Sequence, residues 1–280
     1  MLNRRFTVIL WILFFIFPTI CIAVTETAGR AEDLFRSGLT FAGEAVPLGR
    51  VDVHESLDQE LLLLSEAKAR VWLTLRRSGR YLPVIEKALD GAEVSRDFKY
   101  LPMALSNLDP LYRSGQRRGL WRLSEGEAAS MGLSVNKLVD QRLDPEASSA
   151  AAAIRLKTLR TGYGSWTMAL AAFLDEDALA AAVLEAGGGK DYYLLYVPET
   201  LDKAVSQVIA GKILYSDPGV YGYGPSKPWP VLSRSVVRLD AASDMYELAQ
   251  RYGTDYKTFR DMNPHILTDA APAGSSIHVP

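Results

Sequence analysis

Apolar residues recur with helical spacing over most of this chain. From Val53 to Leu75 they return every three, four or seven positions, which predicts one long amphipathic helix that ends at Gly79. A second helix is expected over residues 83–89. Strand-like alternation of apolar and polar residues is missing before residue 230, so this part of the chain is predicted to be all-helical.

Local signals add further helices to the same part. Ser95 or Asp97 can cap a helix whose first turn contains Pro102, where the missing N–H of proline costs little. More helices are predicted over residues 125–131, 148–161, 166–173 and 201–214. The glycine-rich runs at 187–189 and 219–224 are predicted turns, because neither lies between a strand and a helix as a phosphate loop would.

The pattern changes after a proline-rich linker. Pro225, Pro228 and Pro230 predict a stiff, extended connection. It is followed by a short strand at Val236 and Val237, by short helices over residues 244–252 and 255–262, and by a strand over 277–279. The end of the chain is therefore predicted to be a small β-α-α-β unit.

The start of the chain has the features of an export signal. Arg4 and Arg5 precede an uncharged run over residues 6–24, which ends in small residues that suit a cleavage site. This run is close to the roughly 20 residues that a spanning helix needs, so an uncleaved N-terminal anchor stays open as the alternative. Residues 25–50 are mixed in composition and are expected to be loosely ordered.

Composition excludes several classes of function. The formal net charge of −2 provides no basic surface for nucleic acid. Cys21 is the only cysteine and would leave with the signal, so no disulfide is expected although an exported protein could form one. His54, His265 and His278 are scattered along the sequence, form no metal-binding motif and are expected on the surface. Neither a metal ion nor a cofactor is predicted.

Residues 97–108 carry the most informative motif. They resemble the catalytic helix of the membrane-bound lytic murein transglycosylase D family, in which this helix ends in Ala-Glu-Ser. Here the triplet is Ala104-Leu105-Ser106. Other segments resemble motifs of the same family along nearly all of the remaining chain: residues 41–48, 80–86, 119–121, 140–148 and 198–222.

This resemblance implies a fold and a division into parts. The expected fold is mainly α, with a lysozyme-like helical domain of the goose-type and soluble lytic transglycosylase kind. Segments 248–253 and 262–264 resemble a LysM carbohydrate-binding module. The expected parts are a signal or anchor over residues 1–24, an N-terminal helical extension over 25–94, the lysozyme-like transglycosylase domain over 95–230 and the LysM-like module over 231–280.

The resemblance also implies a reaction for which this chain lacks the central group. In the family, one glutamate protonates the glycosidic oxygen and then removes a proton from the 6-hydroxyl of the sugar, which leaves an anhydro-muramyl end. Leu105 stands at this position and carries no proton. Further departures are Arg122, where the family has glutamine, and residues 116–119 and 172–176, where the family's cleavage-site motifs are changed. The chain is therefore predicted to be catalytically silent rather than an active enzyme.

Asp109, Glu125 and Asp175 are the carboxylates that could replace the missing glutamate. Each is more simply explained as a residue beside a helix start, where negative charge is favourable. For Asp109, the following Pro110 also indicates that the catalytic helix has already ended.

The residues expected to bind glycan follow from the same resemblance: Tyr100, Ser106, Trp121, Arg122, Phe173 and Tyr221. Trp121 is the favoured sugar-stacking residue, because a loop holds it along the groove of the family. Phe173 belongs to a helix that is expected to be buried, so core packing is its default role. Arg122 can bind an acidic peptide stem of peptidoglycan or pair with a nearby carboxylate such as Glu125.

The sequence thus predicts an exported protein of the periplasm or cell envelope that binds peptidoglycan glycan strands or an envelope partner protein without cleaving them. One alternative is an active lytic transglycosylase that cleaves the MurNAc–GlcNAc bond with a displaced carboxylate. Another is a structural protein whose groove is closed by Leu105 and Leu174. Contact with a membrane is expected only through residues 6–24, if they remain uncleaved.

Overall fold

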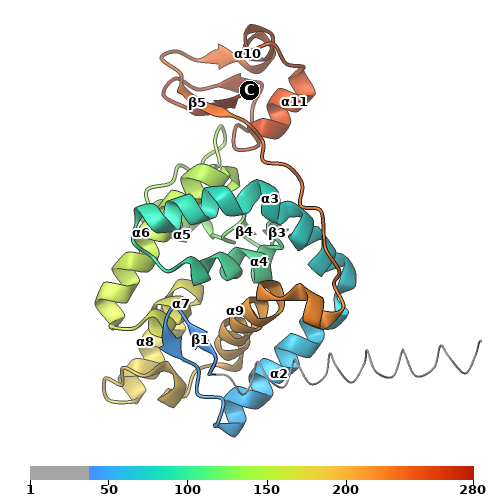
Figure 1. Ribbon diagram of the computed structural model, residues 1–280. Coiled ribbons are helices and arrows are strands. Elements are labelled where there is room, and N and C mark those ends of the chain that lie inside the picture. Colours follow the sequence, from blue (N-terminus) through green and yellow to red (C-terminus); the bar gives the residue numbers. More distant parts are fainter. Residues whose placement is uncertain (1–37) are drawn as a thin grey trace, which may run out of the picture.

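A computed structural model describes residues 38–280 (Figure 1). The predicted export signal over residues 1–24 lies outside the described residues. Residues 38–223 form a helical body, and the end of the chain forms a small module beside it, joined by an extended linker. Among the described residues, no helix is both long and apolar enough to cross a membrane.

The first two helices divide differently from the prediction. Helix α2 spans Val51–Glu66 and helix α3 spans Lys68–Gly91. The helix is interrupted at Ala67, whose N–H donates a hydrogen bond to the carbonyl oxygen of Leu64 at 3.1 Å. The prediction that Gly79 ends one helix and that another begins near Pro83 was wrong, because both residues lie inside α3.

The linker explains why glycine is found in the middle of α3. A Cβ atom at Gly79 would lie 2.2 Å from the carbonyl oxygen of Trp229, which is closer than real atoms approach. The N–H of Trp229 donates to the carbonyl oxygen of Arg76 at 2.7 Å, and the guanidinium of Arg80 lies 4.8 Å from the centre of the Trp229 ring. Gly79 therefore marks a linker contact rather than a helix end. Figure 1 shows the linker passing along α3.

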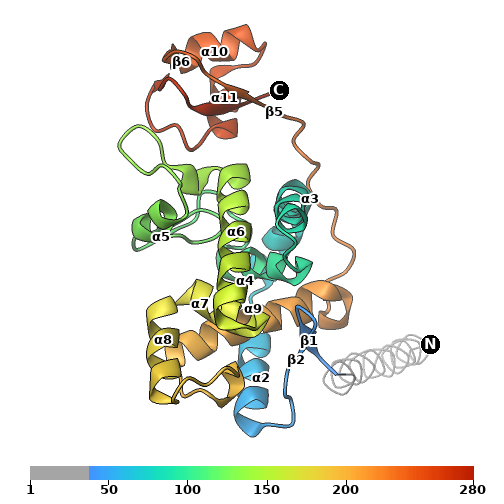
Figure 2. The ribbon, with the colours of Figure 1, turned by 90° about the vertical axis from the view of Figure 1, so that its left-hand side faces the viewer.

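The helical body has a mainly α architecture, as predicted. After α3 come further α-helices: α4 (Tyr100–Ser106), α5 (Glu125–Ser130), α6 (Pro145–Tyr163), α7 (Trp166–Leu174), α8 (Glu176–Glu185) and α9 (Glu199–Ser216). Short 3₁₀ helices lie between or after them: η1 (Arg96–Lys99), η2 (Gln141–Leu143), η3 (Tyr192–Leu194) and η4 (Pro218–Tyr221). Helix α9 packs against α2 and α4, and α6 packs against α3 and α7, around one continuous apolar core (Figure 2).

Two expectations about the body need correction. Residues 38–50 are ordered around the strands β1 (Thr40–Phe41) and β2 (Glu44–Ala45), and Phe41 is completely buried. The carboxylate of Glu44 accepts the N–H groups of Trp166 and Thr167 at 2.6 and 2.8 Å, and so it caps the start of α7. A second hairpin, β3 (Arg113–Ser114) with β4 (Arg117–Arg118), also shows that the body is not free of strands.

The end of the chain contains the elements that its sequence predicts. Strand β5 (Ser235–Arg238) pairs antiparallel with β8 (Ser276–Val279), and helices α10 (Met245–Arg251) and α11 (Tyr256–Met262) lie between them in the sequence. A second strand pair, β6 (Ser243–Asp244) with β7 (Ala270–Ala271), was not predicted. These elements, here called the C-terminal module, enclose an apolar core of their own, which includes Met245, Leu248, Phe259 and Ile277.

Backbone hydrogen bonds join the C-terminal module to the helical body. The N–H of Asp140 donates to the carbonyl oxygen of His265, and the N–H of Leu267 donates to that of Leu138, both at 2.8 Å. Val139 and Ile266 form a β-bridge between them. The loop before α6 thus meets the turn after α11, and the module sits close to the first turn of α6 (Figure 2).

Candidate functional site

A cavity of about 120 Å³ lies beside Leu105. Leu105 comes from α4, and Phe173, Leu174 and Asp175 come from the end of α7 and the residue after it. The remaining wall residues are Arg117, Trp121 and Arg122 from the segment around the β3–β4 hairpin, and Thr200, Leu201 and Ala204 from α9. Sequence reasoning missed Arg117 and the three α9 residues. Small and apolar helix residues such as those of α9 give no signal of a cavity wall.

Helix α4 is short and tightly held, which fixes Leu105. The Ser95 hydroxyl accepts the N–H of Asp97 at 3.3 Å and caps η1, which leads directly into α4. At the other end, Asn107 has a left-handed backbone, with φ of 56°. Arg77 of α3 donates to the carbonyl oxygen of Asn107 and to the carboxylate of Asp109, each at 3.1 Å. Leu105 itself is 7% exposed.

Residues 112–123, here called the hairpin arm, contribute Arg117, Trp121 and Arg122 to the cavity wall. Arg142, in the 3₁₀ helix η2 just before α6, holds this arm. Its Nη1 donates to the carbonyl oxygen of Gln116 at 3.1 Å, while two other nitrogens bind Asp140 at 2.8 and 2.7 Å. Gly119 packs directly on the backbone of Arg142. The arm is therefore anchored through both the side chain and the main chain of one residue.

Trp121 forms part of the cavity wall as a core residue. It is 2% exposed, and its indole N–H donates to the hydroxyl of Ser149 at 3.0 Å. Its ring meets Phe173 edge-on, with 5.9 Å between ring centres. A buried indole with a satisfied donor stabilises the body, and it leaves little ring surface for a sugar to cover.

Arg122 has an unusual backbone and an unusual partner. Its φ of 52° lies in the left-handed region, which costs an ordinary residue roughly 1–2 kcal/mol. Its guanidinium lies 5.2 Å from the centre of the Tyr112 ring, and its buried Nε has no hydrogen-bond partner among residues 38–280. The alternative pairing of Arg122 with Glu125 is not seen. Glu125 is exposed in the first turn of α5.

Three residues predicted to bind glycan lie away from the cavity wall. The Tyr100 hydroxyl lies 3.0 Å from that of Ser216. The Ser106 hydroxyl is fully buried, 2.8 and 2.7 Å from two backbone carbonyl oxygens to which it can donate one at a time. Burial raises the pKa of Tyr221 to about 12.

Two of the three carboxylates that could replace the missing glutamate have other roles, and the third, Glu125, is exposed and does not line the cavity. Asp109 forms the ion pair with Arg77 described above and also accepts the N–H of Leu111 at 3.0 Å. Asp175 does line the cavity, but it is exposed, and its carboxylate caps α8 by accepting the N–H of Ala178 at 3.0 Å. A general acid at neutral pH needs a carboxyl shielded from water, and Asp175 is not shielded.

The cavity is small for a sugar site. Pockets that enclose organic ligands typically measure about 300–1,000 Å³, whereas this one measures about 120 Å³. Tyr192 and Tyr193 line two larger cavities, of about 290 and 240 Å³. The space beside Leu105 therefore suits one group of a ligand rather than a whole sugar residue.

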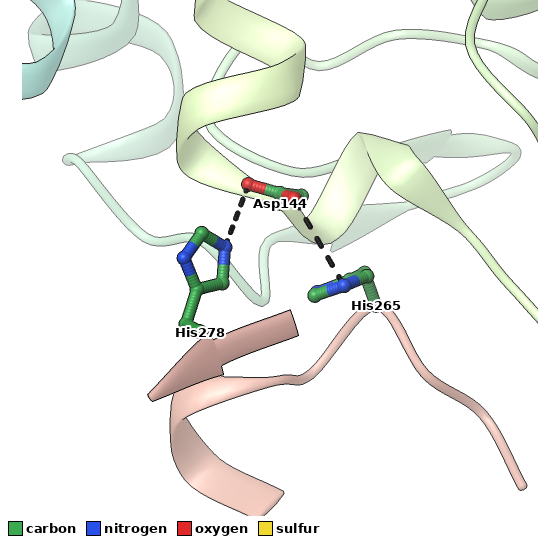
Figure 3. Close-up of side chains that lie close together, drawn as sticks. All are labelled: Asp144, His265 and His278. Atoms are coloured by element: carbon green, nitrogen blue, oxygen red, sulfur yellow. Dashed lines mark hydrogen bonds and ion pairs between the residues drawn. The ribbon is translucent and has the colours of Figure 1, made fainter. Parts of the chain in front are cut away.

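The histidines are not all on the surface, contrary to expectation. His54 is exposed, but His265 and His278 are each 1% exposed. Both lie in the C-terminal module and face Asp144 at the start of α6 (Figure 3). The prediction failed because folding brings together residues that more than a hundred positions separate.

Comparison with known protein families agrees with this geometry. Residues 88–174 match the family model of the transglycosylase SLT domain. The matched segment runs from the end of α3 to the end of α7, and so it contains α4, the hairpin arm and Leu105. This match supports a lytic transglycosylase-like family, as the sequence predicted, although it covers less than half of the chain. No curated protein matches the chain.

Proposed function

We propose that this chain is a catalytically silent lytic transglycosylase-like protein that binds peptidoglycan glycan strands. The observation that carries the proposal is Leu105, a buried aliphatic side chain on the wall of a cavity inside the matched domain. Cleavage of a glycosidic bond requires a proton for the leaving oxygen while positive charge develops on the sugar. Leu105 stands at the position expected for that acid, but its aliphatic side chain has no proton to donate.

The positive charge of two arginines on the cavity wall supports binding of the anionic groups of peptidoglycan. Arg117 and Arg122 both line the cavity beside Leu105. Arg117 already pairs with Glu127 at 3.0 Å, whereas the partner of Arg122 is an aromatic ring. A carboxylate of a peptide stem fits the small cavity and would form charge-assisted hydrogen bonds with Arg122. The sugars themselves would then lie outside the cavity.

The remaining parts of the proposal rest on the resemblance of the sequence. The membership in the transglycosylase D family, the LysM-like character of the C-terminal module and the division at residues 94 and 230 are proposed on the motifs quoted above. Export to the periplasm or envelope is proposed because peptidoglycan lies there. An envelope protein could use the same surface as a partner.

Two other functions have a specific observation in their favour. The small volume of the cavity favours a structural protein whose groove is closed by Leu105 and Leu174. The position of Asp175 on the cavity wall favours an active enzyme with a displaced acid. Glycan retention distinguishes the proposal from the first of these, and product analysis distinguishes it from the second.

The binding part of the proposal predicts that the full chain is retained on insoluble peptidoglycan. Arg122→Gln should weaken retention about tenfold or more, because a hydrogen bond to a charged group contributes about 1.5–3 kcal/mol. Sedimentation with purified sacculi across a range of protein concentrations measures this loss.

Arg113→Gln is the matched control for that experiment. Arg113 is exposed on β3 in the same arm and does not line the cavity, so its loss changes the net charge equally and should leave retention nearly unchanged. If the unaltered chain does not sediment with sacculi, the closed-groove alternative replaces the proposal. Equal losses in both variants would show non-specific charge attraction instead of a site.

A further inference from the structure

We infer that Asp144, His265 and His278 form a zinc-type metal site that fastens the C-terminal module to the helical body. One oxygen of Asp144 and one ring nitrogen of each histidine all lie within 4.8 Å of one another. Figure 3 shows the carboxylate at the start of α6 with the two rings facing it from the module. The site is independent of the glycan-binding proposal.

The separations suit a metal ion of zinc size. His278 Nε2 lies 3.1 Å from Asp144 Oδ1, and His265 Nε2 lies 3.9 Å from Asp144 Oδ2. Tetrahedral zinc with bonds of about 2.0–2.1 Å holds neighbouring ligand atoms roughly 3.3–3.4 Å apart. The His278 distance is close to that value. His265 is measured to the other oxygen of the carboxylate, and its Nε2 would exchange the 2.8 Å hydrogen bond to the carbonyl oxygen of Ser276 for the metal.

The cluster is buried, and hydrogen bonds within the protein satisfy it only in part: His278 Nε2 lies 3.1 Å from Asp144 Oδ1, and His265 Nε2 lies 2.8 Å from the carbonyl oxygen of Ser276. The three side chains are only 1–4% exposed. The Nδ1 atoms of both histidines are buried and have no hydrogen-bond partner within residues 38–280. Buried polar groups of native proteins nearly always have partners, so the two bare Nδ1 atoms mark a cluster whose hydrogen bonding is incomplete.

The ligand set indicates a borderline metal such as Zn²⁺ rather than Mg²⁺ or Ca²⁺, which prefer oxygen atoms alone. Glu146 can complete the set, because its Oε2 lies 3.5 Å from His278 Nε2. Arg234 Nη2 lies 2.6 and 2.8 Å from the two oxygens of Glu146 and holds this carboxylate in place. Since Asp144 and Glu146 belong to α6 and both histidines to the module, the metal would join the two.

Zinc retention by the untagged full chain tests this inference. The protein is stripped with a chelator, mixed with excess Zn²⁺, desalted and analysed for metal by mass spectrometry. We expect close to one zinc ion per chain, a rise in Tm with zinc, and the strong visible absorption of a tetrahedral site when Co²⁺ replaces it. His278→Gln and His265→Gln should each weaken zinc binding by about 100-fold or more.

Two further variants keep the test decisive. His54→Gln removes the remaining histidine of the chain and should retain zinc fully. Asp144→Asn preserves a residue that can cap α6, where the Asp144 carboxylate accepts the N–H groups of Glu146 and Ala147, but it removes the charged ligand. This variant should fold and bind zinc weakly. A chain that loses all zinc on desalting, or variants that retain as much as the unaltered chain, would overturn the inference.

Discussion

Gly119→Ala is expected to lower the free energy of unfolding by about 3 kcal/mol or more. Gly119 has φ of +75°, a conformation that residues with a side chain rarely adopt. An added Cβ would also lie 1.8 Å from the carbonyl oxygen of Arg142, which belongs to the main chain and cannot rotate away. The hairpin arm would have to move from its support, so the loss should appear in urea unfolding as a lower midpoint.

Gly126→Ala is the control for this substitution. Gly126 lies in helix α5, and a Cβ there would meet no atom within 4 Å. Alanine in a helix is more favourable than glycine, so stability should rise by up to about 1 kcal/mol. If both alanine variants unfold at the same urea concentration as the unaltered chain, the close packing of the arm on Arg142 is wrong.

Arg142→Met is expected to cost about 3–5 kcal/mol, the range measured when one partner of a buried ion pair is removed. The ion pair between Arg142 and Asp140 is bidentate, and both side chains are only 9% exposed. The hydrogen bonds that Arg142 donates to the Asp140 carboxylate raise the pKa of Arg142, so the cation is present at every pH at which the protein folds. Methionine keeps an unbranched apolar stem in place of the arginine stem but leaves a buried carboxylate unpaired.

Two comparisons separate this effect from a general loss of charge. Arg155→Met removes a more exposed pair with Glu176 and should cost at most about 1 kcal/mol. Adding Asp140→Asn to Arg142→Met removes the stranded charge, so the double variant should be more stable than Arg142→Met alone. A double variant that is less stable, by the full sum of the two single losses, would show that the pair is not coupled.

Much of the fold could be predicted because helix signals are local. The apolar spacing and caps around α5, α6, α7 and α9 predicted these helices to within a few residues. The errors arose where a distant segment decides the outcome. Gly79 and Pro83 are helix breakers by local rules, yet α3 continues through both, and Gly79 is needed for contact with a linker 150 positions later.

The candidate site was predictable only in part, for the same reason. Leu105, Trp121, Arg122, Phe173 and Asp175 were identified by resemblance, and all five line one cavity. The same resemblance could not show that Trp121 would be buried, with its ring against Phe173 and its indole N–H bonded to Ser149. No local pattern connects Asp144 with His265 and His278, because the chain between them must first fold into the rest of the body and the module.

The most direct test of the account is digestion of purified sacculi with the full chain, followed by muropeptide analysis. General acid/base catalysis typically contributes roughly 10²- to 10⁴-fold, so a chain with Leu105 in place of the acid should release anhydro-muropeptides no faster than a buffer control. Asp175→Asn should give the same blank result. Anhydro-muropeptides released by the unaltered chain and lost in Asp175→Asn would contradict the account and identify Asp175 as the acid.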